Sequence, residues 1–144
     1  MTRRVIRAIE NPQVDILFHP NARQLGRRAA IDIDMDAVIA AAARTGTVLE
    51  INAQPERLDL TDAQVRRARD AGVKLAIDSD AHNAGDLRFT RLYGVFVARR
   101  GWATRADIIN TLPLQRVLEE LKPRTAARPR KTVRRRRPVA HDAA

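Results

Sequence analysis

An aspartate and a histidine two residues apart are the pair of side chains in this sequence best suited to chemistry. Asp80-Ala81-His82 follows a short apolar run at 73–77. If the chain stays extended here, both side chains point the same way, and a carboxylate and an imidazole can bind one metal ion. This pair suits Mn²⁺, Zn²⁺ or Fe²⁺ better than Ca²⁺. The alternative is a polar pair without a ligand.

Two other apolar runs end in polar residues of the same kinds. The run at 14–18 is followed by His19 and Pro20, and the run at 47–51 contains Glu50. The carboxyl ends of parallel strands meet at one edge of a sheet, so we expect these side chains to lie near Asp80 and His82. The proline restricts His19 to an extended conformation, which fixes where its ring can point.

The other polar residues near these run ends each allow two interpretations. Arg23 and Arg57 bind phosphate through their planar donor forks, or they form surface ion pairs. Glu50 contacts and supports the residues that bind a metal or a substrate, or it forms an ion pair with an arginine. Asp78 adds negative charge near the metal, or it pairs with a neighbour. Asn52 is placed to orient a substrate.

The elements that must position these residues alternate between two periodicities, which predicts a parallel α/β fold. Four near-continuous apolar runs predict buried strands at 14–18, 47–51, 73–77 and 93–97. Helices are predicted at 1–10, 35–45, 60–71, 104–110 and 113–121. Four strands are only part of a sheet. If the sheet is a barrel, the chain is one section of it, because a closed α/β barrel usually needs about 200 residues or more.

Composition excludes several classes of protein. The 144 residues include no cysteine, which rules out disulfides, thiolate zinc sites and thiol catalysis. No apolar run approaches the roughly 20 residues of a membrane span. No glycine-rich phosphate loop and no G-x-S-x-G motif is present. The start of the chain lacks an apolar signal core, so we expect a cytoplasmic protein without a membrane partner.

Positive charge is concentrated at the end of the chain. The formal net charge is +10, and residues 123–144 hold eight Lys or Arg, one Asp and three of the seven prolines. Such a segment cannot bury enough apolar surface to fold, so it is predicted to be disordered. It is either a nucleic-acid tether or a solubilising tail. Trp102, beside Arg99 and Arg100, is either a core anchor or a nucleic-acid contact.

Four segments together resemble motifs of the PHP (polymerase and histidinol phosphatase) family. They are 19–28, 50–53 with 57–60, 78–82, and 93–112. The last is similar to the end of the PHP domain attached to bacterial family X DNA polymerases, and the resemblance covers residues 3–122.

The resemblance implies a distorted seven-stranded (βα) barrel with a cluster of divalent metals, usually Mn²⁺ or Zn²⁺, that hydrolyses phosphoesters. In family X polymerases it implies an exonuclease acting on DNA 3′ ends in DNA repair. Matched residue by residue, it implies metal ligands at His19, Asp80 and His82. The implied contacts to substrate are Arg23, Asn52 and Arg57.

The chain departs from the family pattern in one large respect. The family begins its domain with a His-x-His motif, which is absent here, and the third histidine is His141 in the tail. We therefore expect the C-terminal portion of a PHP domain, from a truncated or broken gene, weakly active or inactive unless a partner supplies the missing half. The alternatives are a small-molecule phosphatase of the histidinol phosphate type and an inactive nucleic-acid-binding fragment.

Overall fold

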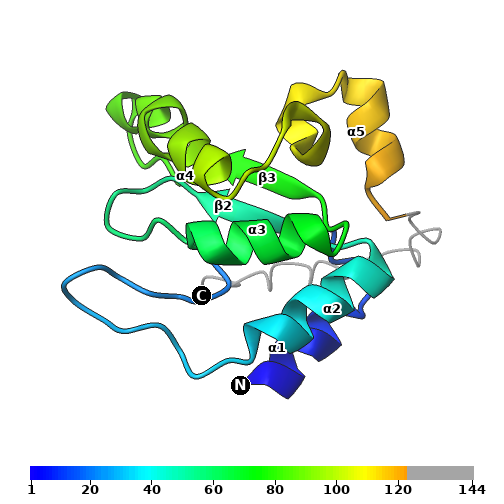
Figure 1. Cartoon of the computed structure of the whole chain (residues 1–144). Coiled ribbons are helices and arrows are strands. Elements are labelled where there is room, and N and C mark those ends of the chain that lie inside the picture. The colour runs from blue at the N-terminus through cyan, green and yellow to red at the C-terminus, as the bar shows by residue number, and fades with distance from the viewer. Residues whose placement is uncertain (123–144) are drawn as a thin grey trace, which may run out of the picture.

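The computed structural model describes residues 1–122, so the predicted disordered tail lies outside the described residues. Helices and strands alternate along the chain (Figure 1). The strands are β1 (Ile16–Leu17), β2 (Val48–Asn52) and β3 (Leu75–Asp78). The α-helices are α1 (Thr2–Ile9), α2 (Met35–Thr45), α3 (Asp62–Asp70), α4 (Val95–Arg100) and α5 (Leu114–Glu120). Short helical turns are η1 (Ala84–Arg88), η2 (Thr90–Gly94), η3 (Arg105–Asp107) and η4 (Ile109–Thr111).

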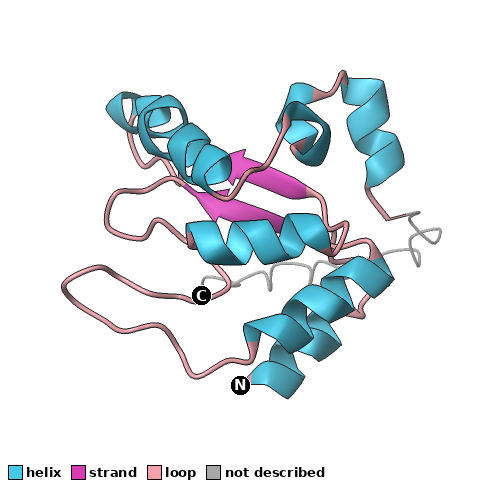
Figure 2. Cartoon of the chain, viewed as in Figure 1, coloured by secondary structure: helices cyan, strands magenta, loops and turns pink. Residues whose placement is uncertain are grey.

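The strands form one parallel sheet in the order β1-β2-β3. Strands β2 and β3 are the two magenta arrows of Figure 2. In register, Leu49 pairs with Leu75 and Asn52 pairs with Asp78. The sequential order and the helix in each connection between strands are those of a parallel α/β arrangement. The last residues of β2 and β3 therefore lie next to each other.

Local sequence signals set the ends of the two central helices. The Asp34 carboxylate accepts a hydrogen bond of 3.0 Å from the Ala37 amide at the start of α2. Helix α2 ends at Gly46, whose φ of 70° most other residues adopt only at a cost. Thr61 and Gln64 form a capping box at the start of α3. Local sequence thus marks the start of both helices and the end of α2.

The main core lies between α1–α4 and one face of the sheet. Leu49, Ile51 and Leu75 point into it and are fully buried. The intervening residues of β2 point to the opposite face. That face has a much smaller apolar cluster, in which Val48 and Ala76 pack with Ile109 of η4. The remaining positions on this second face of β2 are polar.

The predicted α/β class is confirmed, with three of the four predicted strands and with helices at 1–10, 35–45, 60–71 and 113–121 close to their predicted bounds. The helix predicted at 104–110 is instead the two short turns η3 and η4. The described residues form an open sheet, and barrel closure is not seen among them. In the same part of the chain, no helix is long and apolar enough to cross a membrane.

The strand predicted at 93–97 is wrong, because these residues belong to η2 and α4. Gly94 and Ala98 are buried, four residues apart, while Val95 and Phe96 are exposed. That is the spacing of one helix face rather than of a strand buried on both sides. A short apolar run is compatible with either a strand or a helix. Here the small residues Gly94 and Ala98 let a helix pack closely against its neighbours.

Candidate functional site

Polar side chains gather where β2 and β3 end. Glu50 and Asn52 lie on the face of β2 that is opposite the helix-packed core, because side chains alternate along a strand. Both are buried, with exposed fractions of 1% and 0%. Asp78 is the register partner of Asn52 at the end of β3. The strands therefore bring two carboxylates and an amide to one edge of the sheet.

The amide of Asn52 links two carboxylates. Its Nδ2 donates to Glu50 Oε1 at 3.3 Å and to Asp80 Oδ2 at 3.2 Å. Its Oδ1 accepts a hydrogen bond of 3.0 Å from the Gln54 amide. All of these bonds agree on one orientation of the side chain, so Asn52 is a fixed part of the site.

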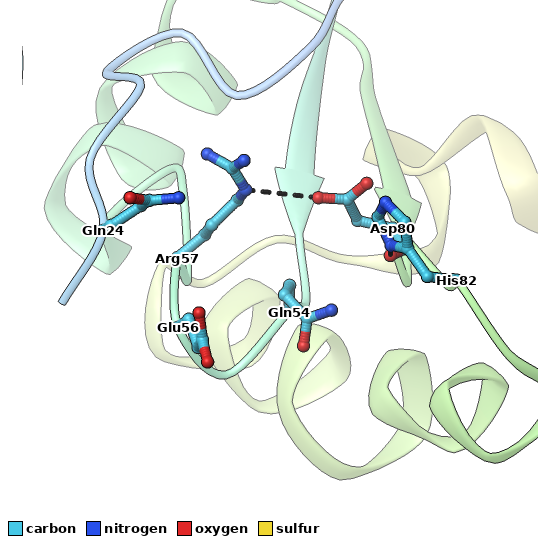
Figure 3. Close-up of a pocket in the computed structure, with 6 residues that line it drawn as sticks. All are labelled: Gln24, Gln54, Glu56, Arg57, Asp80 and His82. Carbon is cyan, nitrogen blue, oxygen red and sulfur yellow. Dashed lines mark hydrogen bonds and ion pairs between the residues drawn. The ribbon is translucent and has the colours of Figure 1, made fainter. Parts of the chain in front are cut away.

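A pocket opens beside this linked group (Figure 3). Its lining residues are Gln24, Gln54, Glu56, Arg57, Asp80 and His82. Arg57 Nε lies 3.2 Å from Asp80 Oδ2, an ion pair whose two side chains are 21% and 25% exposed. The guanidinium group therefore faces the pocket while held in place by a carboxylate.

Glu50 is the most perturbed carboxyl group of the site. The pKa of Glu50 is raised from 4.5 to about 7: burial is the largest cause, the nearby charges of Asp78 and Asp80 add to it, and hydrogen bonds from His19 and Asn52 act against it. The strongest of these bonds comes from the backbone amide of His19. Near neutral pH this group is therefore able to hold or release a proton.

His19 contacts Glu50 rather than the pocket. Its backbone amide donates to Glu50 Oε2, and its ring Nδ1 lies 3.6 Å from the same oxygen. This Nδ1 is buried and has no hydrogen-bond partner. The prediction that Pro20 keeps His19 extended is wrong: φ is 31°. The bond to Glu50 and a turn closed by Ala22, whose amide donates to the His19 carbonyl at 2.9 Å, hold this conformation.

Asp80 and His82 do line the same pocket, although not by the predicted route. Strand β3 ends at Asp78, and Asp80 has a φ of 51°. His82 Nδ1 lies 2.7 Å from the Asp80 carbonyl oxygen, so this nitrogen acts as the donor and Nε2 is left for a ligand. Non-glycine residues with positive φ gather at functional sites because the surrounding structure must enforce them.

These residues alone do not make a complete metal site. Within residues 1–122, no three His, Asp or Glu side chains form a group that could hold one metal ion. His19 is joined to Asp80 only through Glu50 and Asn52. The ligand roles of His19, Asp80 and His82 therefore stay predictions, and so does the supporting role of Glu50 and Asp78 next to those ligands.

Arg23 occupies a different position from Arg57. Its Nε donates to the Arg57 carbonyl at 2.8 Å, and its Nη2 donates to the Leu58 carbonyl. Two of its nitrogens thus clamp the backbone of the loop that carries Arg57. The predicted phosphate contact at Arg23 is untested, and the contacts within the chain are those of a loop clamp.

A buried network beside the site has no counterpart in the sequence analysis. Asp59, fully buried, accepts from the backbone amide of Asn21 at 3.0 Å and from its Nδ2 at 2.5 Å. Asn21 also bonds with Gln64 of the α3 capping box. This network ties the segment after His19 to the start of α3. The T-x-x-Q spacing of Thr61 and Gln64 marks the start of α3, where this network ends, but no sequence pattern pairs Asp59 with Asn21.

No family model matches the chain. The chain is 42% identical over 120 residues to the DNA polymerase/3′-5′ exonuclease PolX of Bacillus subtilis, a match covering 83% of the chain and 21% of that protein. It is 31% identical over 117 residues to a probable phosphatase of Thermoanaerobacter sp., covering 76% of the chain and 44% of the phosphatase. A probable phosphatase of Shewanella sediminis is 37% identical over 92 residues, or 60% of the chain and 35% of that protein. The chain therefore spans between about one fifth and less than half of the length of these relatives.

Proposed function

We propose that the chain is the C-terminal part of a PHP domain of the kind found in bacterial family X DNA polymerases, and that it takes part in the hydrolysis of phosphoesters at nucleic-acid 3′ ends. One observation carries the proposal. Asn52 holds the carboxylates of Glu50 and Asp80 together, and Asp80 in turn holds the guanidinium of Arg57 at the pocket. The planar, positively charged guanidinium of Arg57, held by an acidic neighbour, can bind the oxygens of a phosphoester and the negative charge that develops on them.

Each residue of this group has a proposed role. Arg57 binds phosphate oxygens, since a guanidinium fork matches two of them. Asp80 orients Arg57, and Asn52 keeps the carboxylates in place. Glu50, with its pKa raised to about 7, exchanges a proton close to the pocket at neutral pH. Arg23 holds the loop on which Arg57 lies.

A divalent metal, Mn²⁺ or Zn²⁺, is part of the proposal. When bound, such an ion acts as a Lewis acid and lowers the pKa of a bound water. Because the described residues do not complete a metal site, we propose that His19, Asp80 and His82 supply some of its ligands and that the other half of a PHP domain supplies the rest.

The test measures hydrolysis by the chain with and without the proposed N-terminal half of the PHP domain. The full chain is assayed on a 3′-labelled oligonucleotide in Mn²⁺ or Zn²⁺, alone and mixed with a polypeptide corresponding to the N-terminal half of the domain. We expect cleavage to rise at least tenfold in the mixture and to fall at least tenfold in His82→Ala. His141→Ala is the matched control and should retain the activity. Cleavage that is unaffected by His82→Ala would contradict the proposal.

A second candidate is a small-molecule phosphatase, favoured by the names of two of the relatives. The two candidates differ in the substrate that the same pocket accepts. Comparing the mixture on the oligonucleotide and on a small phosphomonoester, with equal phosphoester concentrations, separates them. Faster hydrolysis of the monoester would favour the phosphatase and overturn the nucleic-acid substrate.

A further inference from the structure

One exposed side of the helical segment 84–100 carries both arginines and large apolar residues. They recur at a spacing of about four residues, which places them on one side of a helix. We call this side the arginine–apolar face: Leu87, Arg88, Arg91, Leu92, Val95, Phe96 and Arg99. Its apolar members are well exposed, from 39% for Val95 to 63% for Leu87. None of these residues lines the pocket described above.

The packing of the segment prevents this face from turning inward. A Cβ atom on Gly94 would lie 2.5 Å from Ile77 Cγ2, and one on Gly101 would lie 2.4 Å from Val65 Cγ1. The helix backbone therefore approaches β3 and α3 at two points, and its buried side needs small residues. The opposite side is held outward, at the outer edge of the molecule (Figure 1).

The arginines of this face are not neutralised by any carboxylate within the described residues. Among residues 1–122, no ion pair involves Arg88, Arg91 or Arg99, whereas the neighbouring Arg100 pairs with Asp62 at 2.8 Å. Arg88 lies over the ring of Phe89, at 5.9 Å from its centroid, and keeps its positive charge. Three guanidinium groups without an ion pair in these residues and a chain of net charge +10 would repel a second copy of the same face. The charge therefore favours an anionic occupant.

We propose that the arginine–apolar face binds single-stranded nucleic acid. Arg88 and Arg91 lie about one helical turn apart and Arg99 about two turns further on, so they can meet phosphates along one strand, and the exposed ring of Phe96 offers a surface on which a base stacks. The segment begins two residues after His82, so a strand whose end lies in the pocket can continue along the face. Only this continuity rests on the proposed function, and binding is measured without hydrolysis.

The first experiment compares two triple variants of the full chain. Binding of a fluorescein-labelled 20-residue oligothymidylate is followed by anisotropy in EDTA over a series of salt concentrations. Arg88→Ala/Arg91→Ala/Arg99→Ala should weaken binding at least tenfold near 0.1 M salt and reduce the slope of log K against log salt by about 2. The control removes three exposed arginines of α1 that have no ion pair in residues 1–122: Arg3, Arg4 and Arg7. The same net charge is lost, and we expect less than a threefold effect.

The second experiment tests stacking. Phe96 is 57% exposed and Leu118 is 55% exposed, so Phe96→Ala and Leu118→Ala remove similar apolar area from the surface. Phe96→Ala should weaken binding about fivefold without changing the salt slope, and Leu118→Ala should leave it unchanged. Equal losses in the two triple variants would mean that charge alone binds, which overturns the proposal. Unchanged binding in every variant also overturns it, and leaves an acidic protein segment as the occupant.

Loss of hydrolysis is a separate result. If the arginine–apolar face binds as expected while His82→Ala has no effect on cleavage, the face stands and the proposed function fails. If cleavage depends on His82 while the arginine variants bind normally, the proposed function stands and binding by the arginine–apolar face is rejected. The two proposals can therefore be rejected independently.

Discussion

The two faces of the sheet differ completely in chemistry, although alternate residues of the same strands form them. One face presents Leu49, Ile51 and Leu75 to the helices and is fully buried. The other presents Glu50 and Asn52, buried as deeply, with only a small apolar cluster beside them. The fold gains its stability on one face and can therefore tolerate a costly buried carboxyl group on the other.

The largest change in the free energy of unfolding should come from a substitution on the helix-packed face. Leu75→Ala removes a fully buried side chain at the centre of the sheet and should lower the free energy of unfolding by about 3–4 kcal/mol. Leu114→Ala, at a leucine 74% exposed on α5, is the control and should change it by less than about 0.5 kcal/mol. Urea denaturation followed by circular dichroism measures both. Equal effects would show that the main core is not where the structure places it.

The next largest change in the free energy of unfolding should come from the polar face, where a substitution should stabilise the fold rather than destabilise it. The folded-state pKa of Glu50, about 7, lies above the unfolded value of 4.5, so the folded state binds more protons between these values and loses stability as pH rises. The whole penalty, about 3 kcal/mol, is present above pH 7. Glu50→Gln does not titrate and should therefore become more stable than the unaltered chain as pH rises from 5 to 8.

The measurement is urea denaturation of both proteins in EDTA at several pH values. The quantity of interest is the difference in unfolding free energy between Glu50→Gln and the unaltered chain, because other titrating groups cancel in it. A difference that is flat with pH would mean that Glu50 is solvated in the folded state. The two faces would then be less different than their burial indicates.

The sequence predicted the helix-packed face better than the polar one. Helix α2 was predicted at its observed bounds, because Asp34 and Gly46 cap it locally. Strand β2 was predicted from its apolar run, yet that run includes Glu50, and periodicity alone does not say that a carboxyl in it is fully buried. The failure at 93–97 has a similar cause, since the buried Gly94 depends on contact with Ile77, far away in the sequence.

The sequence predicted which residues form the candidate site better than it predicted their geometry. The strand-end rule placed Asp80, His82 and Arg57 near one another, and the structure shows them around one pocket. The φ of 31° at His19 was not predictable, because it depends on a bond to Glu50 across 31 positions. The Asp59 network was missed for the same reason: its partners meet only after folding.

A smaller effect is expected from this network, which joins the loops of the polar face to α3. Asp59→Ala leaves the amide and Nδ2 of Asn21 without their buried acceptor and should lower the unfolding free energy by about 2 kcal/mol. Asp59→Asn retains one acceptor oxygen and should cost less. Urea denaturation compares the two, and an equal cost would show that the carboxylate itself, rather than its hydrogen bonds, is needed.

The smallest effect should come from the ion pair between Arg100 and Asp62, on the outside of the helix-packed face. The bond lowers the pKa of Asp62, so its contribution is present above the unfolded pKa and is lost as pH falls through the folded one. Both side chains are well exposed, and exposed pairs are screened by water. A double-mutant cycle of Arg100→Ala and Asp62→Ala at pH 7 should give a coupling of about 0.5 kcal/mol that disappears in 1 M salt. A coupling as large as the loss in Leu75→Ala would mean that charge, and not apolar packing, holds α4 to α3, and the contrast between the two faces would no longer explain where the stability lies.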